Sequence, residues 1–212
     1  MRFYFNCQCK GTLFLVRTQF FRAQIWTFGN NFVFLWGELY GWHISHRLER
    51  SKLKTSMIRI LFVCHGNICR SPMAEFVMKH LVIEAGRGNM FHIESAATSS
   101  EEIGNPVYPP ARRKLAEHGI RCGNKRARQM TRDDYDRFDL IIGMDQWNLR
   151  SMSSICGGDP QGKICLLMDF TDRPGDVADP WYTCNYQQAW EDILEGCQAL
   201  MAAFNRTVFA TT

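Results

Sequence analysis

Short apolar runs alternate with amphipathic stretches after residue 57, and this alternation constrains the fold more than any other feature of the chain. The apolar runs cover residues 58–63, 91–97, 139–144 and 163–168. Runs of this length are typical of strands that are buried on both faces of a parallel sheet. The stretches between them carry apolar residues at helical spacing. The pattern predicts an α/β fold, with a parallel sheet flanked by helices on both faces.

The residues that flank the amphipathic stretches indicate where helices begin. Ser71-Pro72 is typical of a helix start, with the serine as N-cap and the proline in the first turn. Pro109-Pro110 opens another helix, and the last helix is expected to begin near Asn185. In open parallel sheets, ligands bind beyond the carboxyl ends of the strands. The chemistry is therefore expected in the loops that follow the four predicted strands.

The loop after the first predicted strand has the residues of an anion-binding loop. Backbone N–H groups between a strand and a helix N-terminus can form a concave anion site. Gly66 and Asn67 tolerate the left-handed backbone that such a turn needs, and Arg70 can bind two phosphate oxygens. Cys64 opens the loop, where these donors favour a thiolate and Ser71 can donate a further hydrogen bond. The sequence predicts a nucleophile poised to attack phosphorus.

The string Val-Cys-His-Gly-Asn-Ile-Cys-Arg-Ser-Pro at residues 63–72 resembles the signature of the low-molecular-weight protein tyrosine phosphatases. The resemblance covers roughly residues 58–204. It implies a four-stranded parallel sheet with a phosphate-binding loop after the first strand. It also implies hydrolysis of phosphotyrosine through a phosphocysteine intermediate, without a metal or other cofactor. Phosphate-binding or loop-supporting roles are implied for His65, Gly66, Asn67, Ile68, Cys69, Ser71 and Ser95.

Asp179 is the candidate general acid. A tyrosine hydroxyl has a pKa of about 10, so its departure near neutral pH needs a proton donor. Asp179 follows the fourth predicted strand, and Pro180 restricts the backbone beside it. It would protonate the leaving oxygen and then activate the water that attacks the phosphocysteine, which predicts a mildly acidic rate optimum. Trp181 and Tyr182 are predicted to be aromatic walls for the phenyl ring, with loop packing as the alternative.

Two positions depart from the family pattern. Glu101 stands where similar enzymes often carry a tryptophan wall. A carboxylate there would repel the phosphate or favour substrates with basic flanks, and a solvated loop glutamate is the other interpretation. Lys125 occupies the place nearest to a support histidine that is common in the family. The efficiency and substrate range are therefore left open.

The nine cysteines are interpreted as reduced thiols, because their number is odd and the chain has no secretory signal. A cytoplasmic location is therefore expected. Cys69 shares the loop with Cys64, and a reversible disulfide between the two could protect the nucleophile from over-oxidation. A simple packing role for Cys69 is the alternative.

Three other functions stay open. An arsenate reductase would use the same anion loop with a relay of further thiols. The candidate relay thiols are Cys122, Cys156, Cys165 and Cys184. A phosphoarginine phosphatase would share the scaffold, but related enzymes of that kind carry threonine where Ile68 stands. A non-catalytic phosphoprotein-binding module would need neither Cys64 nor Asp179.

Residues 1–56 differ in composition from residues 57–212, which are the predicted phosphatase domain. The first region has a net charge of +6 and holds 13 of the 27 aromatic residues, whereas the second has a net charge of −2. The first region shows no clear period, and it is interpreted as a translated upstream stretch, a flexible or membrane-surface appendage, or a small folded extension. Contact with a membrane is not expected. 

The net charge of the whole chain is +4, too small to indicate a nucleic-acid partner. The resemblance instead implies tyrosine-phosphorylated proteins as partners. The sequence predicts no oligomeric state.

Overall fold

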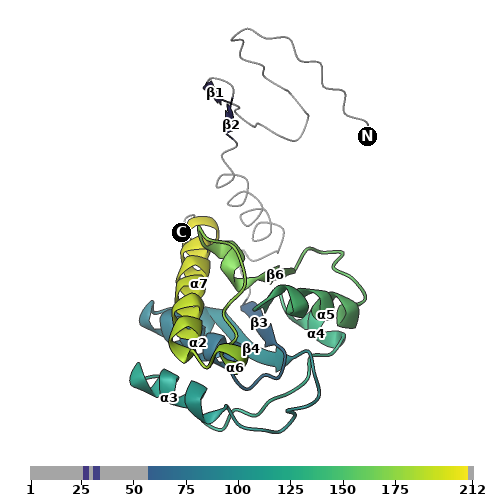
Figure 1. Cartoon of the computed structure of the whole chain (residues 1–212), viewed down its shortest axis with the longest axis vertical. Coiled ribbons are helices and arrows are strands. Elements are labelled where there is room, and N and C mark those ends of the chain that lie inside the picture. Colours follow the sequence, from purple (N-terminus) through teal and green to yellow (C-terminus); the bar gives the residue numbers. More distant parts are fainter. Residues whose placement is uncertain (1–25, 29–30, 34–56, 210–212) are drawn as a thin grey trace. The chain divides into compact units, whose positions relative to one another are not determined.

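The computed structural model describes residues 26–28, 31–33 and 57–209 of the 212-residue chain (Figure 1). The chain divides into a unit of residues 1–39 and a unit of residues 40–212. In the first unit, β1 (Trp26–Phe28) pairs antiparallel with β2 (Asn31–Val33). The predictions for residues 1–56 fall largely outside the described residues and stay predictions.

The second unit is built on a sheet of four strands in the order β4-β3-β5-β6. Its strands are β3 (Ile58–Cys64), β4 (Phe91–Ala97), β5 (Leu140–Gly143) and β6 (Ile164–Leu166). All neighbouring strands are parallel. The predicted α/β fold with a four-stranded parallel sheet is therefore confirmed. The fourth strand is shorter than predicted, because the chain turns into the 3-10 helix η2 (Leu167–Phe170).

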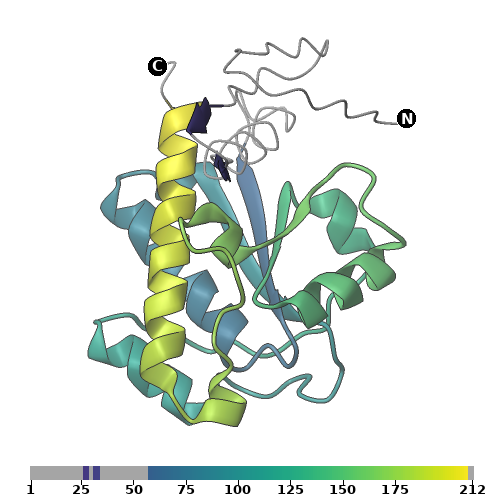
Figure 2. The same ribbon diagram turned by 45° about the horizontal axis from the view of Figure 1, so that its top comes forward.

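Helices cover both faces of this sheet (Figure 1 and Figure 2). One face is covered by α2 (Arg70–Glu84) and α7 (Tyr186–Thr207), and α3 (Pro109–Glu117) packs against these two helices. The other face packs against α4 (Asp133–Arg137) and α5 (Gln146–Cys156). The remaining short helices are η1 (Gly88–Met90) and α6 (Pro180–Thr183).

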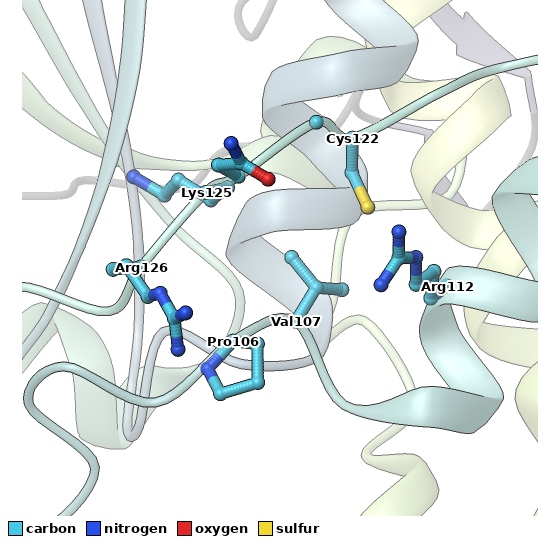
Figure 3. A pocket seen from close by; sticks show the side chains of 8 residues that line it. Pro106, Val107, Arg112, Cys122, Lys125 and Arg126 are labelled. Atoms are coloured by element: carbon cyan, nitrogen blue, oxygen red, sulfur yellow. The ribbon is translucent and has the colours of Figure 1, made fainter.

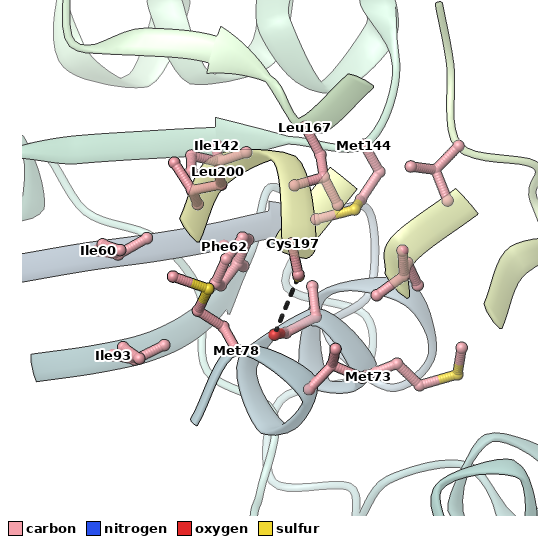
Figure 4. Packing of buried hydrophobic residues seen from close by; sticks show 14 of the residues in the cluster. Ile60, Phe62, Met73, Met78, Ile93, Ile142, Met144, Leu167, Cys197 and Leu200 are labelled. Carbon is pink, nitrogen blue, oxygen red and sulfur yellow. Dashed lines mark hydrogen bonds between the residues drawn. The ribbon is translucent and has the colours of Figure 1, made fainter. Parts of the chain in front are cut away.

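Strand β3 explains why the core has two sides. Ile60 and Phe62 belong to the cluster formed with α2 and α7, whereas Leu61 and Val63 belong to the cluster formed with α4 and α5. Successive strand residues point to opposite faces, so a strand buried on both faces reads as one continuous apolar run. Figure 4 shows Phe62 close to Met78 of α2 within the first cluster. Cys64 is the last residue of this buried strand and therefore lies at the carboxyl edge of the sheet.

Two close contacts tie α7 to the rest of the first face. The Cys197 thiol donates a 3.8 Å hydrogen bond to the carbonyl of Ala74 on α2 (Figure 4). At Gly196, a Cβ atom would lie 2.5 Å from Cγ of Leu167 in η2. A larger residue at Gly196 would have to displace the Leu167 side chain or move α7 away from η2, because packed interiors leave no room for extra methyl groups.

The helix starts agree with the predictions at α3 and α7 but not at α2. Asn185 is the N-cap of α7, and its side chain accepts a hydrogen bond from the N–H of Gln188. Helix α2 already begins at Arg70, with Cys69 as N-cap and no side-chain cap. The prediction that Ser71 caps α2 is wrong, because the Ser71 hydroxyl is engaged with other atoms of the loop.

Among the described residues, no helix combines the length and apolar character that crossing a membrane requires.

Candidate active site

The loop between β3 and α2 turns around the sulfur of Cys64. Asn67 has a left-handed backbone, with φ of 56°, and its N–H donates a 3.3 Å hydrogen bond to the Cys64 Sγ. Cys64 is 3% exposed and Asn67 is 1% exposed. Asparagine tolerates this backbone region better than most residues, which explains its use at the turn. The loop therefore presents a backbone N–H group, three residues before the start of α2, to a buried sulfur.

Side chains behind the loop form a hydrogen-bonded group. The Ser71 Oγ lies 3.0 Å from the Cys64 Sγ. The Asn67 Nδ2 donates 2.8 Å hydrogen bonds to the Oγ atoms of both Ser71 and Ser95. Ser71 and Ser95 are fully buried. The structure thus brings four of the residues predicted for the loop and its support into one contiguous group.

Arg70 lies between two carboxylates that come from distant parts of the sequence. Its Nη1 donates to the Asp145 Oδ2 at 2.7 Å, and its Nη2 donates to the Asp179 Oδ2 at 2.5 Å. Arg70 is 3% exposed. Burial works against its charge, but the negative charges of Cys64, Asp179 and Asp145 outweigh burial and raise the pKa of Arg70. The guanidinium is therefore a fixed cation beside the cysteine loop.

Asp145 was missed by the sequence reasoning as a site residue. It follows β5, at the same sheet edge as the cysteine loop, and it is the N-cap of α5. Its Oδ1 accepts a 2.7 Å hydrogen bond from the N–H of Asn148, which leaves Oδ2 for Arg70. The signal was present, because Asp145 follows a predicted strand and such positions collect at the carboxyl edge of a parallel sheet.

Asp179 is held by the short helix that follows it. Its Oδ1 accepts a 3.0 Å hydrogen bond from the N–H of Trp181, and Pro180 occupies the first position of α6. The other oxygen contacts Arg70. The Asp179 side chain is 25% exposed, so it faces both the buried guanidinium and solvent. The predicted acid and the predicted phosphate-binding arginine are therefore in direct contact.

The predicted substrate-facing residues form a more exposed rim. Trp181 is 58% exposed and Tyr182 is 84% exposed. The Trp181 ring lies 5.9 Å from the ring of Tyr108. Glu101 contacts the loop directly, because its Oε2 lies 3.2 Å from the Nε2 of His65. The roles of these residues as substrate walls stay predictions.

Cys69 lies at the base of the same loop and differs from Cys64 in its surroundings. Its Sγ is 3.9 Å from the Tyr186 hydroxyl oxygen, and the residue is 7% exposed. Burial and then the negative charge on Cys64 raise the pKa of the Cys69 thiol to about 12. Both thiols are free in the structure, so the disulfide between them stays a prediction.

The part of the chain that the structure describes has no group of three or more His, Cys, Asp or Glu residues placed to hold a metal ion. It does have a hollow of about 70 Å³ (Figure 3). The hollow is lined by Pro106, Val107, Arg112, Cys122, Gly123, Asn124, Lys125 and Arg126. Cys64 and Arg70 are not part of its lining.

Comparisons with known proteins give one consistent family. A family model described as low molecular weight phosphotyrosine protein phosphatase matches residues 59–210. The chain is 38% identical to the low molecular weight protein-tyrosine-phosphatase YfkJ of Bacillus subtilis over 152 residues, which are 71% of this chain and 97% of the relative. It is 40% identical to a low molecular weight phosphotyrosine protein phosphatase of Gallus gallus over 148 residues, 68% of this chain and 92% of the relative.

Solved structures show the same likeness in three dimensions. The crystal structure of YfkJ from Bacillus subtilis has a TM-score of 0.70 at 37% identity and covers 72% of this chain and 98% of its own. The structure of a Drosophila arginine phosphatase has a TM-score of 0.63 at 30% identity, over 69% of this chain and 98% of its own. The fold is therefore shared with solved proteins of both these names.

Proposed function

Because the chain belongs to the low-molecular-weight phosphotyrosine protein phosphatase family, we propose that this enzyme hydrolyses phosphotyrosine in proteins through a phosphocysteine intermediate. The single observation that carries the proposal is the placement of the Cys64 sulfur inside the loop, 3.3 Å from the Asn67 nitrogen and 3.0 Å from the Ser71 oxygen. Such donors favour a thiolate, which is the reactive form of cysteine. Residues 57–212 form the proposed phosphatase domain.

The first step transfers the phosphoryl group to sulfur. The loop amides and Arg70 bind the phosphate oxygens, and the Cys64 thiolate attacks phosphorus opposite the tyrosine oxygen. An S–P bond forms as the P–O bond to tyrosine breaks. Asp179 gives its proton to the departing phenolic oxygen, so tyrosine leaves as a neutral hydroxyl.

The second step releases phosphate and restores the enzyme. Asp179, now a carboxylate, takes a proton from a water molecule that attacks the phosphorus. A P–O bond forms, the S–P bond breaks, and Cys64 returns as a thiolate that the loop N–H groups and Ser71 can stabilise. No step uses a metal or a cofactor.

Through the contact between Asp179 and Arg70, binding of the substrate phosphate would act on the proposed general acid. In the structure Arg70 donates to both Asp145 and Asp179. A bound phosphate dianion would compete for this guanidinium and would repel the Asp179 carboxylate. Repulsion between like charges favours the protonated form of an acid, which is the form that the first step needs. Asp145 does not have to move, because its second oxygen is held as the cap of α5.

The expected partners are tyrosine-phosphorylated proteins, whose phenyl ring would lie against the exposed rim of Trp181 and Tyr182. Glu101, beside His65 on that rim, would favour substrates with basic flanks. Cys69 is the proposed redox partner of Cys64. The cytoplasmic location stays a prediction.

A second candidate function is hydrolysis of phosphoarginine. It is favoured by the likeness to the Drosophila protein, whose printed name is arginine phosphatase. Against it stands Ile68, an apolar loop residue that is 8% exposed, where the resemblance places threonine in arginine phosphatases. An N–P bond in the substrate would need a proton on nitrogen in place of oxygen, but the same nucleophile would serve.

One experiment separates these functions. Phosphotyrosine, phosphoserine and phosphoarginine peptides of the same sequence are incubated with the full chain and with its Cys64→Ser variant. The proposal expects phosphate release from phosphotyrosine above all, and none from the variant. Preference for phosphoarginine would support the second candidate. Peptide binding without turnover would indicate a binding module, and thiol-dependent arsenate reduction without peptide hydrolysis would indicate a reductase.

A further inference from the structure

The hollow of Figure 3 lies between the chain that leads into α3 and the turn at residues 122–126. The two segments are joined by an antiparallel bridge between Pro106 and Arg126. Val107 and Cys122 line the hollow and are each 4% exposed, so they form an apolar floor. Backbone pairing and packing therefore hold the walls of the hollow together.

The lining of the hollow carries positive charges and no carboxylate. The charged lining residues are Arg112, Lys125 and Arg126. The Lys125 amine is engaged elsewhere, because it donates a 2.9 Å hydrogen bond to the Ser95 carbonyl. Among the described residues, the Arg112 side chain forms no ion pair, and the Arg126 side chain donates only a 3.3 Å hydrogen bond to the Gly104 carbonyl. Both arginines are exposed, so their charges are available to a ligand.

The shape and the charge of the hollow suit an oxyanion. In Figure 3 the guanidinium of Arg112 is directed toward Val107 and Cys122, and the guanidinium of Arg126 lies beside Pro106. A guanidinium can donate two parallel hydrogen bonds to a carboxylate or a phosphate. Since a single water needs about 10–15 Å³, the volume of about 70 Å³ has room for such a group. A concave surface lined by charges of one sign also concentrates its electric field, which favours an anion.

Tyr108 connects the hollow to the candidate active site. It follows Val107 in the chain, and its N–H donates a 2.9 Å hydrogen bond to the carbonyl of Ile68 in the cysteine loop. The centroid of its ring lies 5.9 Å from that of Trp181 on the rim. Tyr108 is 37% exposed, so a ligand on the rim can contact it. The lining of the hollow and the rim are therefore linked through a single residue.

We propose that the hollow is a second oxyanion site, in which Arg112 and Arg126 bind a carboxylate or phosphate group of the substrate protein at some distance from its phosphotyrosine. The inference rests on the proposed function, because it narrows the substrates of that reaction. Glu101 contacts His65 of the loop and would act on the residues next to the phosphotyrosine. The preferred substrate therefore has basic residues beside its phosphotyrosine and an acidic group farther along its chain.

The test compares the full chain with its variants Arg112→Gln, Arg126→Gln and, as the matched control, Arg113→Gln. Arg113 is the exposed neighbour of Arg112 on α3, and it is not part of the lining of the hollow. The substrates are phosphotyrosine peptides that carry one glutamate at successive distances from the phosphotyrosine, the same peptides with glutamine in its place, and a small aryl phosphate. For each protein, kcat and KM are measured at low and high salt, together with the melting temperature.

The unmodified enzyme should have a KM about 3- to 10-fold lower for one glutamate position than for the matching glutamine peptide, the size expected of two exposed charged contacts. Arg112→Gln and Arg126→Gln should each remove most of this advantage and leave kcat within about twofold, because the contact is equally strong before and during the reaction. High salt should also remove the advantage. Arg113→Gln should keep it. The aryl phosphate should have the same KM with every variant, since it does not reach the hollow.

Direct binding is measured by NMR on the full-length Cys64→Ser variant, which is expected not to turn the peptides over. The glutamate peptide, and not the glutamine peptide, should shift the amide signals of Gly123 and Asn124, which line the hollow. A shift caused by inorganic sulfate, with no advantage for the glutamate peptide, would assign the hollow to a free anion and would overturn the inference.

Two kinetic results would also overturn it. One is an equal KM for glutamate and glutamine peptides at every position, and the other is a loss in Arg113→Gln as large as that in Arg112→Gln. Turnover of the aryl phosphate with a trapped phosphocysteine would leave the proposed function standing in either case. Their absence from the unmodified enzyme would remove that function, whereas the signals of Gly123 and Asn124 would still report on the hollow.

Discussion

The base and the rim of the candidate active site are built in opposite ways. At the base, Cys64, Asn67 and Arg70 are each at most 3% exposed, and hydrogen bonds hold all of them. At the rim, Trp181 and Tyr182 are 58% and 84% exposed. Burial and hydrogen bonds therefore fix the positions of the base residues, whereas substitutions at the rim should change the stability of the fold little. We infer that the base carries the chemistry and the rim carries the choice of substrate.

The largest effect should come from removing the nucleophile. Cys64→Ser should lower kcat by about 10⁴-fold or more, the size seen when a covalent nucleophile is lost. Cys184→Ser is the control, because Cys184 is an exposed thiol. Phosphate release from an aryl phosphate measures both. If Cys64→Ser kept a substantial part of the activity, the reaction would not depend on the residues of the base.

Asp179 lies where the base meets the rim. The loss of rate on replacing it should depend on the leaving group. Asp179→Asn should lower kcat by about 10²- to 10³-fold for phosphotyrosine, because a general acid contributes about that much. The loss should be far smaller for an aryl phosphate whose phenol leaves readily as an anion. Asp172→Asn, an exposed residue of the same segment, is the control, and equal losses for both leaving groups would remove the acid role.

The two cysteines of the base should react at different rates. The pKa of Cys69 is raised to about 12, so its thiol stays neutral from acidic pH to well above pH 8, and raising the pH toward 12 is needed to ionise it. Iodoacetamide near neutral pH should therefore modify Cys64 about tenfold faster or more, as judged by mass spectrometry of peptides. Bound phosphate should protect Cys64. Preferential alkylation of Cys69 would contradict the contrast between the two sulfurs.

Changes on the rim should be the smallest and should fall on KM. Trp181→Ala should raise KM for an aryl phosphate by up to about tenfold, because an aromatic pair contributes about 0.5–1.5 kcal/mol. Glu101→Gln should change KM by less than about fivefold, raising it for peptides with basic flanks and lowering it for acidic ones. Glu102→Gln on the same loop is the control. A large loss of kcat from either rim substitution would contradict the assignment of the chemistry to the base and of substrate choice to the rim.

Much of the sheet and the cysteine loop could be predicted because they depend on local signals. A run such as residues 58–63 is too short for a helix and too apolar for a loop, and Gly66 and Asn67 mark the turn after it. The end of the fourth strand was less predictable. Leu167 and Met168 are buried in η2, and their hydrophobicity is equally compatible with a strand.

The contacts that complete the site could not be read from spacing. Asp145 reaches Arg70 from 75 residues away, and Lys125 reaches Ser95 from 30 residues away. Both depend on how the strands are ordered in the sheet, which no local pattern specifies. At Ser71 a local signal was misleading. A serine before a proline predicts a helix cap, but the Ser71 hydroxyl instead contacts Cys64 and Asn67.

Rapid quenching of the enzyme during turnover of a ³²P-labelled aryl phosphate tests the central claim most directly. The account predicts label bound to the protein through Cys64, formed in a burst before steady-state phosphate release and absent from Cys64→Ser. Label on a histidine, a serine or no residue at all, with phosphate still released at the full rate, would contradict it.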